Sequence, residues 1–186
     1  MKLSVKQIAA IGIMAAVISV LSPLAIPLST EVPISLATLA VMLAGALIGS
    51  KLGTFAVLIY ILLGMIGIPV FANYSAGAGV VFGMTGGYII GYLPLAFLTG
   101  WIYERFGRKK SGVMEYVVLF VGMLVGTVVL YVIGTIWFMR YTGMSLAASL
   151  AACVIPFIPG DLLKMVVVCL LVPRLKKTAD RLIANS

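Results

Sequence analysis

The chain has 186 residues, of which 63% are hydrophobic and only 10% are charged. Soluble domains average about 45–50% apolar and about 25% charged residues, so these few charges cannot cover the surface of a soluble domain of this size. The formal net charge is +8, and a basic balance can indicate nucleic-acid binding. Here the basic residues stand at the ends of long apolar segments, which is typical of the cytoplasmic loops of an integral membrane protein.

The composition also excludes several kinds of catalysis. The chain contains no His, which excludes a His general base, a His zinc site and a Ser-His-Asp set. Its two cysteines, Cys153 and Cys169, form no Cys-x-x-Cys motif, and no Walker motif for ATP is present. An intramembrane aspartyl protease needs two carboxylates that share a proton, whereas the predicted spans contain Asp161 alone. We therefore expect no catalytic residues, no metal and no cofactor.

The first half of the chain predicts three membrane helices, because about 20 apolar residues make one span. The first covers residues 7–26, and this uncharged segment is too long for the hydrophobic region of a usual signal peptide. The second covers residues 33–48 and begins with a proline, which suits a first helical turn. The third covers residues 52–68 and ends before Pro69, which cannot continue a helix.

The next apolar segment must reverse direction, because no residue from Leu52 to Tyr103 is charged and this is much longer than one span. The Gly-rich residues 73–87 supply the reversal, and a fourth span follows over residues 83–103. Two further spans with a short extracellular helix between them complete a single six-helix domain over residues 1–186: these elements cover residues 116–139, 144–153 and 156–172.

The placement of Lys and Arg predicts the orientation of the six spans. One side of the membrane receives eleven of these residues: Lys2, Lys6, Lys51, Arg105, Arg108, Lys109, Lys110, Arg174, Lys176, Lys177 and Arg181. The other side receives Arg140 alone, and Lys164 lies within the sixth span. Because cytoplasmic loops carry an excess of Lys and Arg, we expect both termini in the cytoplasm.

Asp161 and Lys164 are the only charged residues inside a predicted span. A charge at the centre of an inserted helix costs roughly 2.5–3.5 kcal/mol, and residues at i and i+3 share a helix face and can form a pair. An ion pair that fixes helices together is one interpretation, and a ligand-binding site is the one that intramembrane ionisable residues favour. Because the pair is formally neutral, it suits a neutral polar head group rather than a bare ion.

The residues around the Gly-rich turn form a second candidate site. Aromatic side chains with a few amide and hydroxyl groups can bracket a small heterocycle, and glycines let the backbone approach a ligand closely. The candidates are Phe71, Asn73, Tyr74, Thr85, Gly86, Gly87 and Tyr88. A flexible loop with interfacial tyrosines explains the same residues equally well.

The first predicted span carries small residues four positions apart, Gly12 with Ala16 and Ala15 with Ser19. Such faces permit close packing of helices in membranes. The spacing is compatible with packing inside the helix bundle and with packing against another membrane protein.

Three segments of the chain resemble the BioY family, the biotin-specific S components of energy-coupling factor (ECF) importers. They are residues 39–49, residues 67–72 leading to 83–91, and residues 158–164. The first is a generic membrane segment and the other two are specific. The chain departs from the family pattern at Met84, where proline is frequent, and at Asn73, where glycine or alanine is expected.

This resemblance implies a transport protein in a bacterial cell membrane that is not an enzyme. It implies that biotin binds from outside, with its ureido ring near Asp161 and Lys164 and with the residues of the Gly-rich turn around it. Import would require a transmembrane coupling subunit, facing Gly12, Ala15, Ala16 and Ser19, and two cytoplasmic ATPases. The alternatives are a stand-alone vitamin carrier or channel that needs no ATPase, and a protein whose buried pair is purely structural.

Overall fold

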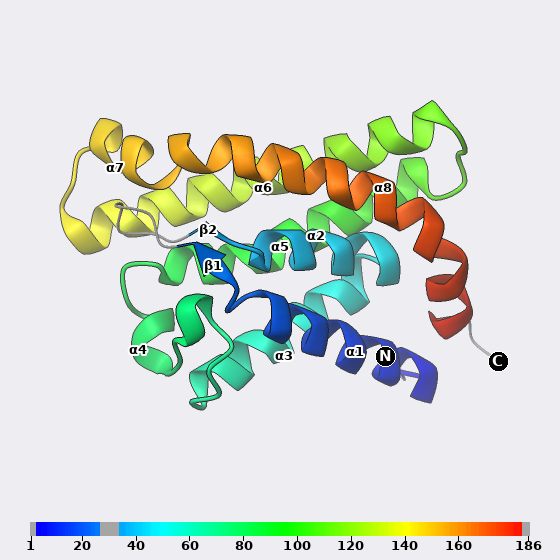
Figure 1. The fold of residues 1–186 in the computed structure, drawn as a ribbon, viewed down its shortest axis with the longest axis horizontal. Coiled ribbons are helices and arrows are strands. Elements are labelled where there is room, and N and C mark those ends of the chain that lie inside the picture. The colour runs from blue at the N-terminus through cyan, green and yellow to red at the C-terminus, as the bar shows by residue number, and fades with distance from the viewer. Residues whose placement is uncertain (1–2, 27–33, 184–186) are drawn as a thin grey trace.

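The computed structural model describes residues 3–26 and 34–183, and this part of the chain is almost entirely helical. Its elements are α1 (Val5–Leu21), β1 (Ala25–Ile26), β2 (Ile34–Ser35), α2 (Ala37–Ile48), α3 (Ser50–Met65), η1 (Ala72–Tyr74), α4 (Ala78–Val81), α5 (Gly86–Ile102), η2 (Tyr103–Gly107), α6 (Val113–Thr142), α7 (Leu146–Cys153), η3 (Ile155–Phe157) and α8 (Ile158–Ile183). The longer helices lie roughly side by side along the long axis of the molecule (Figure 1). The prediction of an α-helical protein is therefore confirmed.

Two stretches of the described residues are long and apolar enough to cross a membrane. They are Val113–Thr142, which is α6, and Leu146–Arg181, which includes α7 and most of α8. The helices α1, α2 and α3 are apolar but shorter. A span of about 20 residues matches the thickness of the hydrocarbon layer, so the length and composition of α6 and α8 suit a membrane environment.

The helix α5 is central in the bundle, since it packs against α2, α3 and α6. Glycines on the facing helices allow close contact. A Cβ atom on Gly45 of α2 would lie 2.3 Å from the carbonyl oxygen of Ala96, and a Cβ atom on Gly134 of α6 would lie 2.3 Å from the ring of Tyr88. Small residues let helix backbones approach closely in membranes, so these two glycines determine how α2 and α6 lie against α5.

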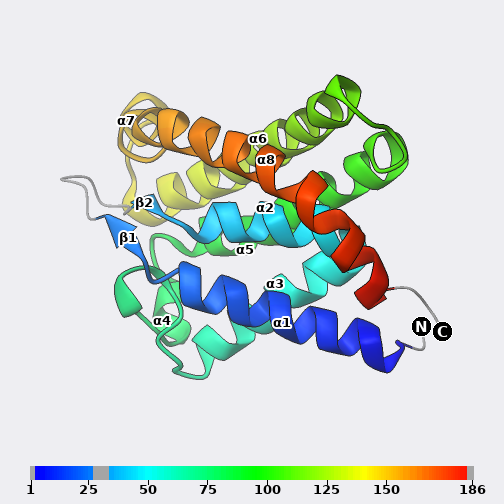
Figure 2. The ribbon, with the colours of Figure 1, turned by 45° about the vertical axis from the view of Figure 1, so that its right-hand side comes forward.

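The two ends of the bundle differ in character. The start of α1 and the end of α8 lie at one end, and the β1–β2 hairpin, α4 and α7 lie at the other (Figures 1 and 2). At the first end, Lys176 pairs with Glu115 at 3.0 Å, while Arg108 pairs with Asp180 and also donates to the carbonyl oxygen of Leu47 at 3.0 Å. These contacts tie the last turns of α8 to α6, to the α5–α6 connection and to the end of α2.

The first helix ends earlier than the sequence predicts. The predicted span over residues 7–26 is helical only to Leu21, because residues 22–24 form a turn and Ala25–Ile26 then form β1, which pairs antiparallel with β2. Short apolar segments do not distinguish a strand from a helix by their pattern, which explains the error. The predicted start of the second span at Pro33 lies outside the described residues, and α2 begins at Ala37.

The boundaries also differ in the middle of the chain. The third helix begins at Ser50 and ends at Met65, where the chain turns through Gly67 with a φ of 106°. The observed helix α5 begins at Gly86, three residues after the predicted start of the fourth span at residue 83. The residues before it include the separate helix α4 over residues 78–81. A glycine tolerates such a positive φ without the clash that a side chain causes, so Gly67 allows the chain to turn away directly after α3 ends.

The last helix is longer than predicted, since α8 continues through Pro173 to Ile183 instead of ending at Val172. Proline inside a helix removes one backbone hydrogen bond. The turns beyond it are held by the ion pairs of Lys176 and Asp180 and by the buried side chain of Ala179. Tertiary contacts thus override the local signal to stop.

The packing of α5 predicts how two glycine substitutions differ. Gly45→Ala should lower the thermal midpoint of the detergent-solubilised protein, because the added methyl group meets the backbone of Ala96 and overpacking typically costs about 1–3 kcal/mol. Gly12→Ala is the matched control, since a Cβ atom there meets nothing within 4 Å. Equal thermal midpoints for the two variants, measured by scanning fluorimetry, would contradict the close α2–α5 contact.

Candidate ligand-binding site

Asp161 and Lys164 are both buried, at 3% and 7% exposure, near the start of α8. Their side chains pair directly, with Lys164 Nζ 2.9 Å from Asp161 Oδ1. The 3-10 turn η3 with Pro156 and the first turn of α8 with Pro159 place this pair close to the end of the bundle that carries α7 (Figure 1). The expected shared helix face is therefore observed, and the pair points into the protein.

The ammonium group of Lys164 uses all of its hydrogen-bond donors. Besides the bond to Asp161, Nζ donates to the backbone carbonyl of Ser35 at 2.7 Å and to Thr38 Oγ1 at 3.0 Å. A lysine ammonium carries three N–H donors and no acceptor. Lys164 is thus saturated within the protein, and it connects α8 to β2 and α2.

The carboxylate of Asp161, in contrast, keeps one acceptor position open. Its Oδ1 accepts from Lys164 and from Thr38 Oγ1 at 3.0 Å, and its Oδ2 accepts from the hydroxyl of Tyr131 on α6 at 2.6 Å. Each carboxylate oxygen can accept two hydrogen bonds, so the described residues leave one lone pair of Oδ2 unused. We call Asp161, Lys164, Thr38, Tyr131 and the Ser35 carbonyl the buried polar cluster.

A small cavity of about 40 Å³ borders the buried polar cluster. The described residues that line it come from six helical elements and from β2: Ser35, Thr38, Tyr88, Tyr92, Leu130, Tyr131, Cys153, Phe157, Asp161 and Lys164. The hydroxyl of Tyr88 reaches across it, 3.4 Å from the backbone carbonyl of Cys153 and 3.3 Å from Thr135 Oγ1. The cavity is thus polar along the cluster and apolar or aromatic elsewhere.

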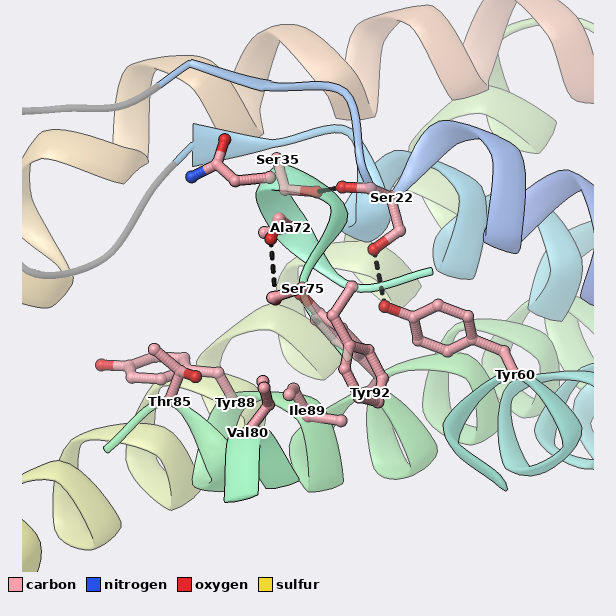
Figure 3. Close-up of a pocket in the computed structure, with 12 residues that line it drawn as sticks. Ser22, Ser35, Tyr60, Ala72, Ser75, Val80, Thr85, Tyr88, Ile89 and Tyr92 are labelled. Atoms are coloured by element: carbon pink, nitrogen blue, oxygen red, sulfur yellow. Dashed lines mark hydrogen bonds between the residues drawn. The ribbon is translucent and has the colours of Figure 1, made fainter. Parts of the chain in front are cut away.

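A larger cavity of about 270 Å³ adjoins the small one, and Ser35, Tyr88 and Tyr92 line both. Its described lining consists of Ser22, Ser35, Tyr60, Phe71, Ala72, Asn73, Ser75, Val80, Thr85, Tyr88, Ile89 and Tyr92. Figure 3 shows the side chains of α5 across from Ser22 and Ser35. Binding sites for small molecules combine such apolar walls with a few polar groups, and the two cavities together offer this combination.

Most hydroxyl groups of the larger cavity are bonded to one another or to the backbone (Figure 3). Ser22 Oγ and the hydroxyl of Tyr60 lie 2.6 Å apart, Ser35 Oγ donates to the Ser22 carbonyl at 2.6 Å, and Ser75 Oγ donates to the Ala72 carbonyl at 2.8 Å. Buried polar groups that are satisfied in this way stabilise one arrangement of the wall. These bonds therefore fix the positions of most of the hydroxyl groups of the wall.

The segment after α3 is held in an unusual backbone conformation. Asn73 and Tyr74 have φ values of 55° and 58°, and this left-handed region is tolerated by Asn but uncommon for a bulky residue. The backbone N–H of Asn73 donates to the carbonyl of Pro23 at 3.2 Å, and the ring of Phe71 packs edge-on against Tyr60 at 5.5 Å. These contacts hold Asn73 and Phe71 at the wall of the larger cavity.

The sequence candidates separate into two groups in the structure. Phe71, Asn73 and Thr85 line the larger cavity, Asp161 and Lys164 line the smaller one, and Tyr88 lines both. Tyr74 is 65% exposed and, like Gly86 and Gly87, is not among the described lining residues. A Cβ atom on Gly87 would lie 2.2 Å from Trp137 Cβ, so this glycine permits close contact between α5 and α6.

Sequence reasoning missed several residues of the candidate site, among them Thr38, Tyr92 and Tyr131. Tyr92 follows Tyr88 by four positions and shares its helix face, and its hydroxyl makes no hydrogen bond within the described residues while lining both cavities. Tyr131 is a hydroxyl-bearing residue in the middle of an apolar span, which is the signal that could have revealed it. Thr38 carries no signal of its own in the sequence.

The small residues of α1 face two directions. Gly12 and Ala16 are exposed, and a Cβ atom on Gly12 would meet nothing within 4 Å, whereas Ala15 is buried and Ser19 is half-buried. The four residues therefore do not form one common surface. Gly12 and Ala16 are available to another molecule, and Ala15 packs within the bundle.

Comparison with known proteins agrees with this arrangement. The model of the BioY family matches residues 1–181. The biotin transporter BioY of Rhodobacter capsulatus is 41% identical, over 87% of this chain and 88% of its own, and the biotin transporter BioY of Thermotoga maritima is 36% identical, over 92% and 96%.

Two solved structures share the fold. The S-component for biotin from an ECF-type ABC transporter superposes with a TM-score of 0.85 at 32% identity, over 93% of this chain and 92% of its own. The S component of a bacterial ECF transporter superposes with a TM-score of 0.56 at 15% identity, over 97% and 98%, and shows the fold alone. From the family match along nearly its whole length, this chain belongs to the BioY family.

Proposed function

We propose that this membrane protein binds biotin and acts as the substrate-binding S component of an ECF-type importer. The observation that carries the proposal is the buried polar cluster, which is neutral overall and keeps one acceptor position of Asp161 open beside a cavity. A neutral head group with N–H donors fits such a position. The ureido ring of biotin has two N–H donors and one carbonyl acceptor, and the names of the relatives indicate the same ligand.

The contacts of the cluster support different roles for Asp161 and Lys164 in binding the ligand. Asp161 Oδ2 accepts an N–H of the ureido ring at its open position, while Lys164 balances the charge of the carboxylate and holds it in place. Because Lys164 has no free N–H donor, it reaches the ureido carbonyl only by releasing one of its protein bonds. The hydroxyl of Tyr92 is a second donor for that carbonyl, since it lines both cavities.

We also propose that the protein crosses the plasma membrane six times, through α1, α2, α3, α5, α6 and α8. The start of α1, the α5–α6 connection and the end of α8 lie at one end of the bundle (Figures 1 and 2), and these segments carry most of the basic residues. The positive-inside rule places this end in the cytoplasm. The cavities lie at the opposite end, so the ligand enters from outside.

Transport by this fold is proposed to require a transmembrane coupling subunit and two cytoplasmic ATPases. The likeness to S components of ECF transporters supports this assembly over a stand-alone carrier or channel. The exposed face of α1 with Gly12 and Ala16 is the proposed contact for the coupling subunit, because small exposed residues permit close helix contact. Ala15 and Ser19 support this helix from the inner side.

Substitutions in the buried polar cluster test the ligand site. Asp161→Asn and Lys164→Met should each weaken biotin binding by roughly tenfold to over a hundredfold, because each variant disturbs charge-assisted bonds that contribute about 1.5–3 kcal/mol each. The measurement is titration of monodisperse, detergent-purified protein with biotin. Arg140→Met is the control, since it removes an exposed cation at the same end of the bundle and should leave the affinity unchanged.

A purely structural pair predicts a different pattern for these variants. Both would fold poorly, and whatever fraction folds would bind biotin normally. Unchanged affinity in well-folded Asp161→Asn and Lys164→Met would therefore reject the ligand site and leave the pair as a contact between helices.

Cysteine labelling tests the orientation. Ser111→Cys lies in the exposed α5–α6 connection and should react with a membrane-impermeant maleimide only after the cells are permeabilised. Met144→Cys, at the other end of α6, should react in intact cells, and the native Cys153 and Cys169 are buried. Labelling of Ser111→Cys from outside intact cells would overturn the proposed orientation.

Bulk on the exposed face of α1 tests the partner contact. Gly12→Leu should reduce co-purification with a coupling subunit, because a clash of about 1–3 kcal/mol weakens association by about five- to over a hundredfold. Biotin binding should be retained, since Gly12 is not among the described residues that line either cavity. Val128→Leu on the exposed side of α6 is the control, and equal recovery of the partner with both variants would show that another face makes the contact.

A further inference from the structure

We infer that the site binds the ureido ring of its ligand through the charged Asp161 and makes no charged contact with the carboxylate at the other end. Derivatives of biotin in which this carboxylate is a neutral amide are therefore ligands as well. This inference rests on the proposed function. It extends the substrate class from one vitamin to ureido-ring compounds with a carboxylate, a carboxamide or an extended amide at the tail. Three observations carry it: the lining of the larger cavity, the placement of the cations, and the exposure of Asn73.

Of the described residues that line the larger cavity, none offers a charged side chain to a ligand. Among the described residues that line it, the polar groups are hydroxyls and one side-chain amide. The hydroxyls of Ser22, Ser35 and Ser75 are already engaged with protein partners. The amide of Asn73 and the hydroxyls of Thr85 and Tyr92 are the remaining neutral donors among the described residues of the wall. A ligand whose head lies at Asp161 extends into this cavity, because the two cavities meet at Tyr88 and Tyr92.

Among the residues that the structure describes, no Lys or Arg lines the larger cavity to neutralise a carboxylate there. Eleven of the thirteen Lys and Arg residues belong to the predicted cytoplasmic side, and the other two are Arg140 and Lys164. Lys164 is saturated and already paired with Asp161. Arg140 is exposed and lines a separate surface hollow with Trp137 and Tyr141. Residues 27–33 contribute a Glu and no Lys or Arg to the sequence.

The cost of removing a carboxylate from water determines where the tail of the ligand lies. A carboxylate that leaves water without a charged partner is strongly destabilised, so the tail carboxylate stays where water reaches it. Asn73 is exposed and lines the larger cavity, so the cavity meets solvent beside it. The tail therefore points outward past Asn73, and an amide at its end gives up no charge interaction and has room to extend.

The test is titration of the purified protein in detergent with biotin and three of its derivatives. We expect the primary amide of biotin, and an amide extended by an ethylene glycol chain, to bind within about threefold of biotin, which is a small difference in free energy. Biotin methylated on a ureido nitrogen should bind at least about tenfold more weakly, because it loses the donor that faces Asp161. The affinity for biotin should change little between low and high salt, since no unscreened ion pair forms at the tail.

A substitution of Asn73, which is exposed and lines the larger cavity, tests directly whether the tail of the ligand passes this residue. Asn73→Asp is compatible with the left-handed backbone at this position and adds a negative charge beside the proposed path of the tail. The ratio of the affinities for biotin and its amide should shift by about three- to tenfold in favour of the amide, as expected for two like charges near solvent. Asn73→Gly is the uncharged control, since Gly also adopts this backbone conformation, and it should leave this ratio unchanged.

The possible outcomes separate the inference from the proposed function. If biotin binds and both amides bind at least about thirtyfold more weakly, a charged group of the protein contacts the tail carboxylate and the inference is wrong. If Asn73→Asp leaves the ratio of affinities unchanged, the tail does not pass Asn73 and the inference is wrong as well. If neither biotin nor the amides bind to folded protein, the proposed function itself fails.

Discussion

The bonds of Lys164 are the interaction on which the rest of the site depends. One ammonium group connects the start of α8 to the carbonyl of β2, to a threonine of α2 and to its own neighbour Asp161. Removing one member leaves a buried charge without its partner, which is far more costly than losing a surface pair. The cluster therefore has to form as a unit, and in forming it determines the direction of the one acceptor that Asp161 has left.

The helices supply the geometry that this cluster requires. Glycines such as Gly45 and Gly134 let α2 and α6 lie very close to α5, and α5 in turn carries Tyr88 and Tyr92 into the space between the cavities. In a membrane, where lipid competes with apolar packing, close backbone contact and hydrogen bonds hold helices together. The same glycines that make the bundle compact thus also place the aromatic wall of the site.

Much of this could be predicted from the sequence, and the omissions have physical causes. Charges inside a span are rare enough to identify Asp161 and Lys164 without a structure, and hydropathy identified the helices. It could not show that the residues after Leu21 form a strand, because pairing with β2 is a contact between separate segments. Nor could it reveal Thr38, whose role comes from its position across from α8.

The acceptor that β2 offers to Lys164 is a backbone carbonyl, and every residue type carries that group. A substitution of Ser35 that preserves the strand keeps the oxygen in place, while the hydroxyl bonds of Ser35 to its own neighbours are lost. This part of the cluster is therefore invisible to side-chain mutagenesis and to comparison of sequences. The anchoring of Lys164 by β2 thus depends on the path of the backbone, whereas the side chain of Ser35 contributes separately to the wall of the cavities.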